Sequence, residues 1–175
     1  MTYKLAILGA TGSVGRQILE VLGERGFPSK DIIALGRRAS SGREVSFGDR
    51  RLRVRDVEDF DFSQTDLTIM AVGEKAARRL APKVLAGGGH LIDVSPAFRM
   101  DANAALIAPE ANPEMIEKLS GTRLLTIPGG SAALLTTILR AIKDAAGIRR
   151  ATVTALLSAS EAGRAAMDEL WTQTK

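Results

Sequence analysis

Three glycines near the start of the chain stand where a phosphate-binding loop would need them. Gly9, Gly12 and Gly15 fall in the segment GATGSVG, between a short apolar run at residues 4–8 and a segment with helical spacing at 13–22. Glycine permits a tight turn, lets the backbone approach a pyrophosphate, and leaves the amides of a helix start facing the anion. The first gap is one residue longer than in the commonest form of this motif. The segment predicts dinucleotide binding; the alternative is that the glycines serve only packing.

A second loop carries groups that suit a phosphate on the cofactor's ribose. A site that prefers NAD usually has an acidic residue about 20 residues beyond the glycine loop. This chain instead has the segment GRRASSG at 36–42, with Arg38 and Ser40 at its centre. Guanidinium and hydroxyl groups suit a 2′-phosphate, so the sequence favours NADP over NAD. The alternative is an ordinary basic surface loop.

The composition excludes several kinds of site. The 175 residues include no cysteine and one histidine, so disulfides, thiolate-bound metals and a thiol nucleophile are excluded, and no metal site is expected. The net charge of +4 does not predict a nucleic-acid partner. No window approaches the roughly 18 apolar residues of a membrane span, and the first residues lack a signal peptide's apolar stretch. We therefore expect a cytoplasmic protein without a membrane span.

The elements that would position these loops alternate between strands and helices. Such alternation is typical of βαβ units, so it predicts an α/β fold: a Rossmann-like parallel sheet with helices on both faces. A further edge strand is expected where Arg51, Arg53 and Arg55 alternate with apolar residues. We expect its basic face to be solvated, and the alternative is a binding patch. The other predicted strands cover 4–8, 32–35, 67–72, 91–94 and 124–127, and the predicted helices cover 13–22, 75–86 and 132–146.

The last part of the chain starts a different pattern. Residues 149–157 predict a strand, and residues 161–172 predict a helix that has no Gly or Pro end signal before Lys175. That strand would expose its edge if it lacked sheet partners, so we expect it to pair with another chain, in a homo-oligomer or with another protein, or to aggregate. The expected domains are a dinucleotide-binding domain at 1–147 and the beginning of a truncated second domain at 148–175.

Two segments carry a resemblance to a known enzyme family. The sequences DVSPAFRMD at 93–101 and APEANPE at 108–114 resemble those of aspartate-semialdehyde dehydrogenase. The segments GATGSVG, RRASSGRE, APKVLAGGGHLIDVSPAFRMD and DAAGIRRATVT also occur in the family's order, so the resemblance covers nearly the whole chain. It implies the reduction of aspartyl phosphate with NADPH through a cysteine thioester, in amino-acid biosynthesis. It also implies dimers or tetramers of considerably longer chains, whose second domain forms the dimer face.

The resemblance assigns cofactor roles to individual residues. Residues 11–14 match the loop that holds the cofactor's phosphates, Ser40 matches a serine that grips the adenosine phosphate, and Ser160 matches a serine that contacts the cofactor. The family's arginine in the second loop aligns with Ala39, so Arg38 is the candidate substitute. Together with the flanking glycines, the predicted cofactor-binding residues are Gly9, Thr11, Gly12, Ser13, Val14, Gly15, Arg38, Ser40 and Ser160.

The resemblance also assigns a substrate role to one arginine. Arg99 matches the arginine that binds the substrate's phosphate, and a planar guanidinium suits that task. The alternative for Arg99 is a salt bridge to Asp101 or Asp93. His90 matches no catalytic residue, and we expect it to be a solvated histidine at a strand end.

The catalytic positions depart from the family's pattern. Where the family has Pro-Asn-Cys-Ser, this sequence has PGGS at 128–131, so Gly130 stands at the position of the nucleophilic cysteine. Leu157 stands at the position of a substrate-orienting glutamine, and Glu161 at that of a glycine beside the cofactor. Glycine carries no nucleophile, and Ser131 lies one residue further along, where we expect it to cap the following helix. We therefore expect no catalytic residues.

Three functions are consistent with these patterns. The loss of the nucleophile and of the substrate-orienting amide favours a non-catalytic relative of the family, which keeps an NADP-binding loop and acts by binding or as a structural subunit. The second function is that of a working NADP-dependent aspartate-semialdehyde dehydrogenase, represented by an altered or truncated chain. The third, direct hydride transfer by another reductase, would need a Tyr-x-x-x-Lys pair. Tyr3, the only tyrosine, has no lysine four places on.

Overall fold

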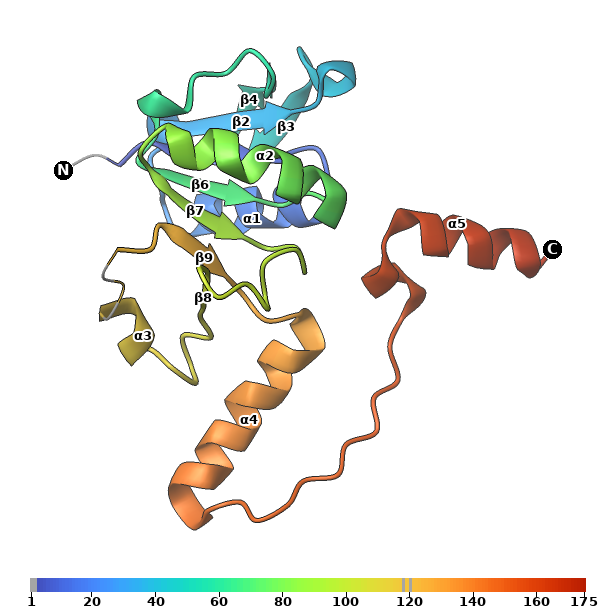
Figure 1. Ribbon diagram of the computed structural model, residues 1–175. Helices are drawn as coiled ribbons and strands as arrows, with labels where there is room; N and C mark the ends of the chain where they lie inside the picture. Colours follow the sequence, from blue (N-terminus) through green and yellow to red (C-terminus); the bar gives the residue numbers. More distant parts are fainter. Residues whose placement is uncertain (1–2, 118, 120) are drawn as a thin grey trace. The chain divides into compact units, whose positions relative to one another are not determined.

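A seven-stranded parallel sheet forms the centre of the protein (Figure 1). The computed structural model describes residues 3–117, 119 and 121–175. The strand order is β5-β2-β1-β6-β7-β9-β8, and every neighbouring pair is parallel. The strands are β1 (Leu5–Leu8), β2 (Ile32–Gly36), β5 (Arg55–Asp56), β6 (Leu67–Met70), β7 (His90–Asp93), β8 (Ala105–Leu106) and β9 (Leu124–Thr126).

The first strand is the central one, and its sequence explains why. All four residues of β1 are buried, which fits a strand that is covered on both faces. Leu5 pairs in register with Ile32 of β2 on one side and with Leu67 of β6 on the other. After β1 the chain runs first to β2, on one side of β1, and later to β6, on the other side of β1. In sheets of this kind, ligands bind in the crevice outside the carboxyl ends of the strands at such a change of direction, here those of β1 and β6.

Two helices cover opposite faces of the sheet (Figure 1). Helix α1 (Ser13–Glu24) packs Leu19 into a cluster that contains Ile7 of β1. Helix α2 (Glu74–Ala86) packs Leu80 and Val84 into a second cluster, with Leu8 and Met70 from the sheet. The predicted α/β class, a Rossmann-like parallel sheet with helices on both faces, is confirmed.

The basic segment predicted as one edge strand forms two. Strand β3 (Glu44–Phe47) and β4 (Arg50–Arg53) make a separate antiparallel hairpin, whereas Arg55 belongs to β5 and pairs beside β2. Arg51 and Arg53 are exposed, and the Arg51 guanidinium lies 3.3 Å from the Glu44 carboxylate across the hairpin. The alternation therefore indicated the solvated face correctly and missed the partner strand.

Several short elements complete the fold. They are the 3-10 helices η1 (Ser29–Asp31), η2 (Arg38–Ser40), η3 (Phe62–Gln64) and η4 (Ala159–Ala162), and the helix α3 (Glu114–Glu117). Among the described residues, no helix is both long enough and apolar enough to cross a membrane.

The chain divides into two compact units, Met1–Arg140 and Ala141–Lys175. Helix α4 (Gly130–Ala146) includes the point of division, and the second unit contains η4 and α5 (Arg164–Gln173). The predicted strand at 149–157 is wrong, because residues 150–158 form no regular element. A strand needs a neighbour for its backbone hydrogen bonds, and no described segment pairs with this one. The predicted helix at 161–172 begins later, since Gly163 (φ +92°) separates η4 from α5.

Candidate functional site

The glycine loop lies in the crevice at the carboxyl end of the sheet. The N–H groups of Gly9 and Ala10 both donate to the Leu35 carbonyl, at 2.9 and 3.1 Å, which ties the loop to the end of β2. Gly9 has φ +90°, and a Cβ atom there would lie 2.2 Å from the carbonyl oxygen of Ala71. Only glycine fits at this position, because the loop passes against the segment that follows β6.

The other two glycines bring the start of α1 against this loop. A Cβ on Gly15 would lie 2.2 Å from the Gly9 carbonyl oxygen, so the first turn of α1 packs directly on the loop. Gly12 is the N-cap of α1 and provides no side-chain cap. The first amides of a helix have no partners within the helix, and they attract anions. Ser13 and Val14, in this first turn, are exposed at the crevice. The three glycines thus bring the start of α1 against the ends of β1 and β6, and phosphate binding by this loop stays a prediction.

The second predicted loop meets the first. Ser40 is buried in η2, directly after β2, and the Thr11 hydroxyl donates to its Oγ at 3.5 Å. Arg38 starts the same short helix and is exposed. The structure thus brings together Thr11, Ser40 and Arg38, three of the predicted cofactor residues. They form a polar rim, and residues 37–43, which directly follow β2 in the sequence, include no carboxylate.

Arg99 follows β7, and two backbone carbonyls hold its side chain. Its Nε donates to the Ile127 carbonyl at 3.0 Å and its Nη2 to the Val94 carbonyl at 3.2 Å. Of the described residues, neither Asp93 nor Asp101 lies within ion-pair distance, 4.0 Å, of this guanidinium. The alternative of a salt bridge is therefore wrong, and the positive charge stays unneutralised by direct contact.

The start of α4 faces this arginine. A Cβ placed on Gly129 would lie 3.3 Å from Nη1 of Arg99, whereas a Cβ on Gly130 would meet nothing within 4 Å. Gly130 is the first residue of α4, and the Ala133 N–H donates to the Gly129 carbonyl at 2.8 Å. Ser131 therefore lies inside the first turn, and the expectation that it caps the helix is wrong. The helix therefore begins two residues earlier than predicted.

A buried carboxylate below Arg99 was missed at the sequence level. Asp93 ends β7, is fully buried, and accepts from the Ser95 N–H at 3.1 Å and from the Ser95 hydroxyl at 2.7 Å. Burial raises the pKa of the Asp93 carboxyl, against the lowering effect of the Ser95 hydrogen bonds and of the Arg99 and Arg78 charges. The D-x-S spacing at the end of a strand is the sequence signal that could have indicated this turn.

Three of the predicted positions belong to the second unit. Ser160 and Glu161 lie in η4, and the Ser160 hydroxyl is hydrogen-bonded to that of Ser158. Leu157 precedes them and is exposed. The roles that the resemblance gives to these three residues stay predictions. His90 starts β7 and is exposed, in agreement with a solvated position at a strand end.

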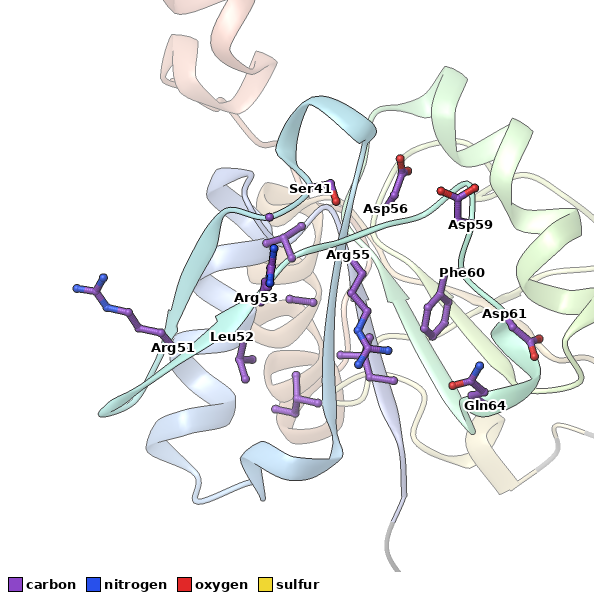
Figure 2. Close-up of a pocket in the computed structure, with 15 residues that line it drawn as sticks. Ser41, Arg51, Leu52, Arg53, Arg55, Asp56, Asp59, Phe60, Asp61 and Gln64 are labelled. Atoms are coloured by element: carbon purple, nitrogen blue, oxygen red, sulfur yellow. The ribbon is translucent and has the colours of Figure 1, made fainter.

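A cavity of 740 Å³ lies between the edge of β2 and the basic hairpin, and Ser41 and Gly42, at the end of the second loop, help to line it (Figure 2). Figure 2 shows Arg51 and Arg53 on one side of it, Asp59 and Asp61 on the other, and Arg55 between them. Both oxygens of the Asp61 carboxylate accept hydrogen bonds from Ser63, at 2.9 and 2.8 Å. This cavity is not lined by any residue that was predicted to bind cofactor or substrate.

Known proteins with similar sequences share this fold. Residues 4–119 match the family described as semialdehyde dehydrogenase, NAD binding domain. Aspartate-semialdehyde dehydrogenase 2 of Vibrio cholerae is 38% identical over 98% of this chain and 51% of its own. The USG-1 protein homolog of Azotobacter vinelandii is 38% identical over 97% of this chain and 50% of its own.

A solved structure is similar over the whole chain. Aspartate semialdehyde dehydrogenase II from Vibrio cholerae, complexed with ASA, superimposes with a TM-score of 0.90 at 37% identity. The match covers 99% of this chain and 52% of that one. The chain therefore spans about half the length of the curated relatives that it matches.

Proposed function

Because the chain belongs to the aspartate-semialdehyde dehydrogenase family, through its NAD-binding domain, we propose that it binds NADP but no longer catalyses the dehydrogenase reaction. It acts instead by binding, or as a structural or interaction subunit. The fold and the family provide a dinucleotide-binding domain. The preference for NADP over NAD and the loss of catalysis are our proposals for this chain.

One observation carries the loss of catalysis. The family resemblance puts the nucleophilic cysteine at Gly130, at the first residue of α4, and the chain contains no cysteine at all. The reaction needs a thiolate that attacks an acyl phosphate and a thioester that is then reduced. Without a thiol no such ester forms, and NADPH, which supplies hydride, has no acyl group to reduce.

The remaining residues of the site support binding of anions. The Arg99 guanidinium has hydrogen-bond donors beyond the two that meet the Ile127 and Val94 carbonyls. It lies beside the amino end of α4, where the helix dipole favours negative charge. A phosphate or carboxylate would thus be held by Arg99 and the first turn of α4, although no side chain at Gly130 would attack it.

The choice of NADP is supported by the second loop. Arg38 and the Ser40–Thr11 pair lie at the end of β2, where an NAD site would carry a carboxylate for the ribose hydroxyls. A cationic and hydroxyl-bearing rim complements a 2′-phosphate.

The proposal is tested by separating turnover from binding. We expect no NADPH formation from aspartate semialdehyde, phosphate and NADP, while calorimetry detects NADP binding. The Vibrio cholerae enzyme, assayed in parallel, is the positive control for substrate and cofactor. Clear turnover would overturn the proposed loss of catalysis and favour a working dehydrogenase. Failure of both NADP and NAD to bind at millimolar concentration would reduce the glycine loop to a packing feature.

A further inference from the structure

We propose that Asp93 and Ser95 are positioning residues, which set the Arg99 guanidinium in the orientation that an anion requires. The inference rests on the proposed function in one respect, that Arg99 binds a negatively charged group. It concerns a fully buried carboxylate to which neither the family resemblance nor the cofactor loops give a task.

The Asp93 carboxylate stabilises a turn directly after β7. Its Oδ1 accepts from the Ser95 N–H at 3.1 Å and its Oδ2 from the Ser95 hydroxyl at 2.7 Å, and the Ser95 Oγ accepts in turn from the Ala97 N–H at 3.1 Å. These three bonds reverse the chain immediately after β7. A carboxylate accepts at both oxygens, whereas an amide would accept at one only, and its NH₂ would require the Ser95 hydroxyl to accept where it now donates.

Two carbonyl groups next to the Asp93 turn accept hydrogen bonds from Arg99. Val94 lies within the turn, and its carbonyl accepts from Arg99 Nη2 at 3.2 Å. The Ile127 carbonyl, which accepts from Arg99 Nε at 3.0 Å, follows β9, and the Ile127 N–H approaches the Asp93 carbonyl at 3.4 Å. Asp93 thus borders both acceptors through its side chain and its backbone. If the turn opened, the Val94 carbonyl would leave the guanidinium plane and Nη1 would lose its place beside Gly129.

A side chain of α2 contacts Phe98, the residue before Arg99. The Arg78 guanidinium lies over the Phe98 ring, 5.6 Å from its centroid, and is paired with Glu74 at 3.0 Å on the same helix. Phe98 is partly buried against the core cluster below α2. The loop from Ser95 to Arg99 is therefore held at its start by Asp93 and near its end by Phe98.

The test follows the Arg99 side chain directly. Side-chain NMR of protein labelled with ¹⁵N-arginine reports the exchange rate of the Arg99 Nε–H, and a titration with inorganic phosphate reports anion binding at the same group. The Arg99 signal is identified by its loss in Arg99→Gln. We expect Ser95→Ala to speed exchange and to weaken phosphate binding about fivefold to tenfold, the effect of one lost hydrogen bond. Ser95→Thr keeps the hydroxyl and restores both values.

Two controls separate positioning from general destabilisation. The proposed NADP site is at residues 9–15, which follow β1 and not β7, so NADP affinity stays at the wild-type value if Ser95→Ala acts only on Arg99. Asp93→Asn provides a second variant if Ser95→Ala does not fold, and the same changes are expected of it. Wild-type exchange and phosphate binding in folded Ser95→Ala or Asp93→Asn would overturn the positioning role. If phosphate leaves the wild-type Arg99 signal unchanged, the anion site fails, while the exchange rates still decide whether Ser95 orients Arg99.

Discussion

A side chain at position 130 would have open space around it. A Cβ there meets nothing within 4 Å, while the neighbouring position already approaches Arg99. The first turn of α4 and the guanidinium both favour a negative charge at this point. At this position the proposed loss concerns one reactive atom, and the helix start and the guanidinium that would stabilise its thiolate are still present.

Replacing Gly130 with cysteine tests those surroundings. We expect the Gly130→Cys thiol to have a pKa below the ordinary value of about 8.5, because the helix start and Arg99 stabilise the thiolate. The thiolate fraction at neutral pH then rises by about tenfold for each unit by which the pKa falls. The measurement is the pH dependence of alkylation by iodoacetamide, which labels one site because the chain has no other cysteine.

Ala145→Cys is the matched control for this substitution. It puts a thiol on an exposed position near the other end of the same helix, where the dipole disfavours the thiolate. Equal pKa values for the two thiols would show that the start of α4 and Arg99 do not act together on this position.

Two loops from different strands meet where the cofactor's adenosine phosphate would lie. The Thr11–Ser40 hydrogen bond joins the glycine loop to η2, so Arg38 is carried on an element with a fixed place beside the crevice. Arg38→Ala is expected to weaken NADP binding roughly tenfold or more, by loss of a charge-assisted contact, and to leave NAD binding unchanged. Calorimetric titration with both cofactors measures the difference.

An arginine at the far end of α1 supplies the control for charge. Arg25→Ala removes the same charge from the C-cap of that helix, away from the amino end that forms the phosphate loop. It is expected to leave both affinities at their wild-type values. Equal weakening of NAD and NADP by Arg38→Ala would contradict a role at the 2′-phosphate.

The elements differ in how well the sequence predicts them. Strands such as Leu5–Leu8 and helices such as Ser13–Glu24 were found because their own apolar spacing determines them. Strand β3 was missed and residues 149–157 were wrongly predicted for one reason: pairing with another segment decides whether an extended run becomes a strand. In the site, Arg99 and the glycines were indicated by motif, whereas the Asp93 turn and the Arg78 contact arise only from tertiary packing.

At the scale of the whole molecule, exposed apolar side chains point to association. Leu134, Ile138 and Ile142 follow one another at every fourth residue of α4 and are 66%, 51% and 48% exposed. Side chains with this spacing lie on one face of a helix. In the second unit, Leu170 and Trp171 are also exposed. Surfaces of this kind are typical of contacts with another chain, which the protein is therefore expected to make.

Association is measured by light scattering and by the emission of Trp171, the only tryptophan. We expect the mass to rise with concentration and the emission to move to shorter wavelength if this ring becomes covered. Ile138→Glu is expected to lower the mass, because it puts a charge on the apolar face of α4. Thr137→Glu, on an adjacent exposed position, is the control. A stable monomer at all concentrations would contradict the expected association.

The support of Arg99 has a consequence for how this chain could change over evolutionary time. Both atoms that accept hydrogen bonds from its guanidinium are main-chain carbonyls, those of Val94 and Ile127. Substitutions at these two positions replace side chains and leave the carbonyls in place, as long as the strands before them persist. A lineage that is released from selection for catalysis would lose its nucleophile freely, while the fold itself would continue to present a cation at the mouth of the crevice.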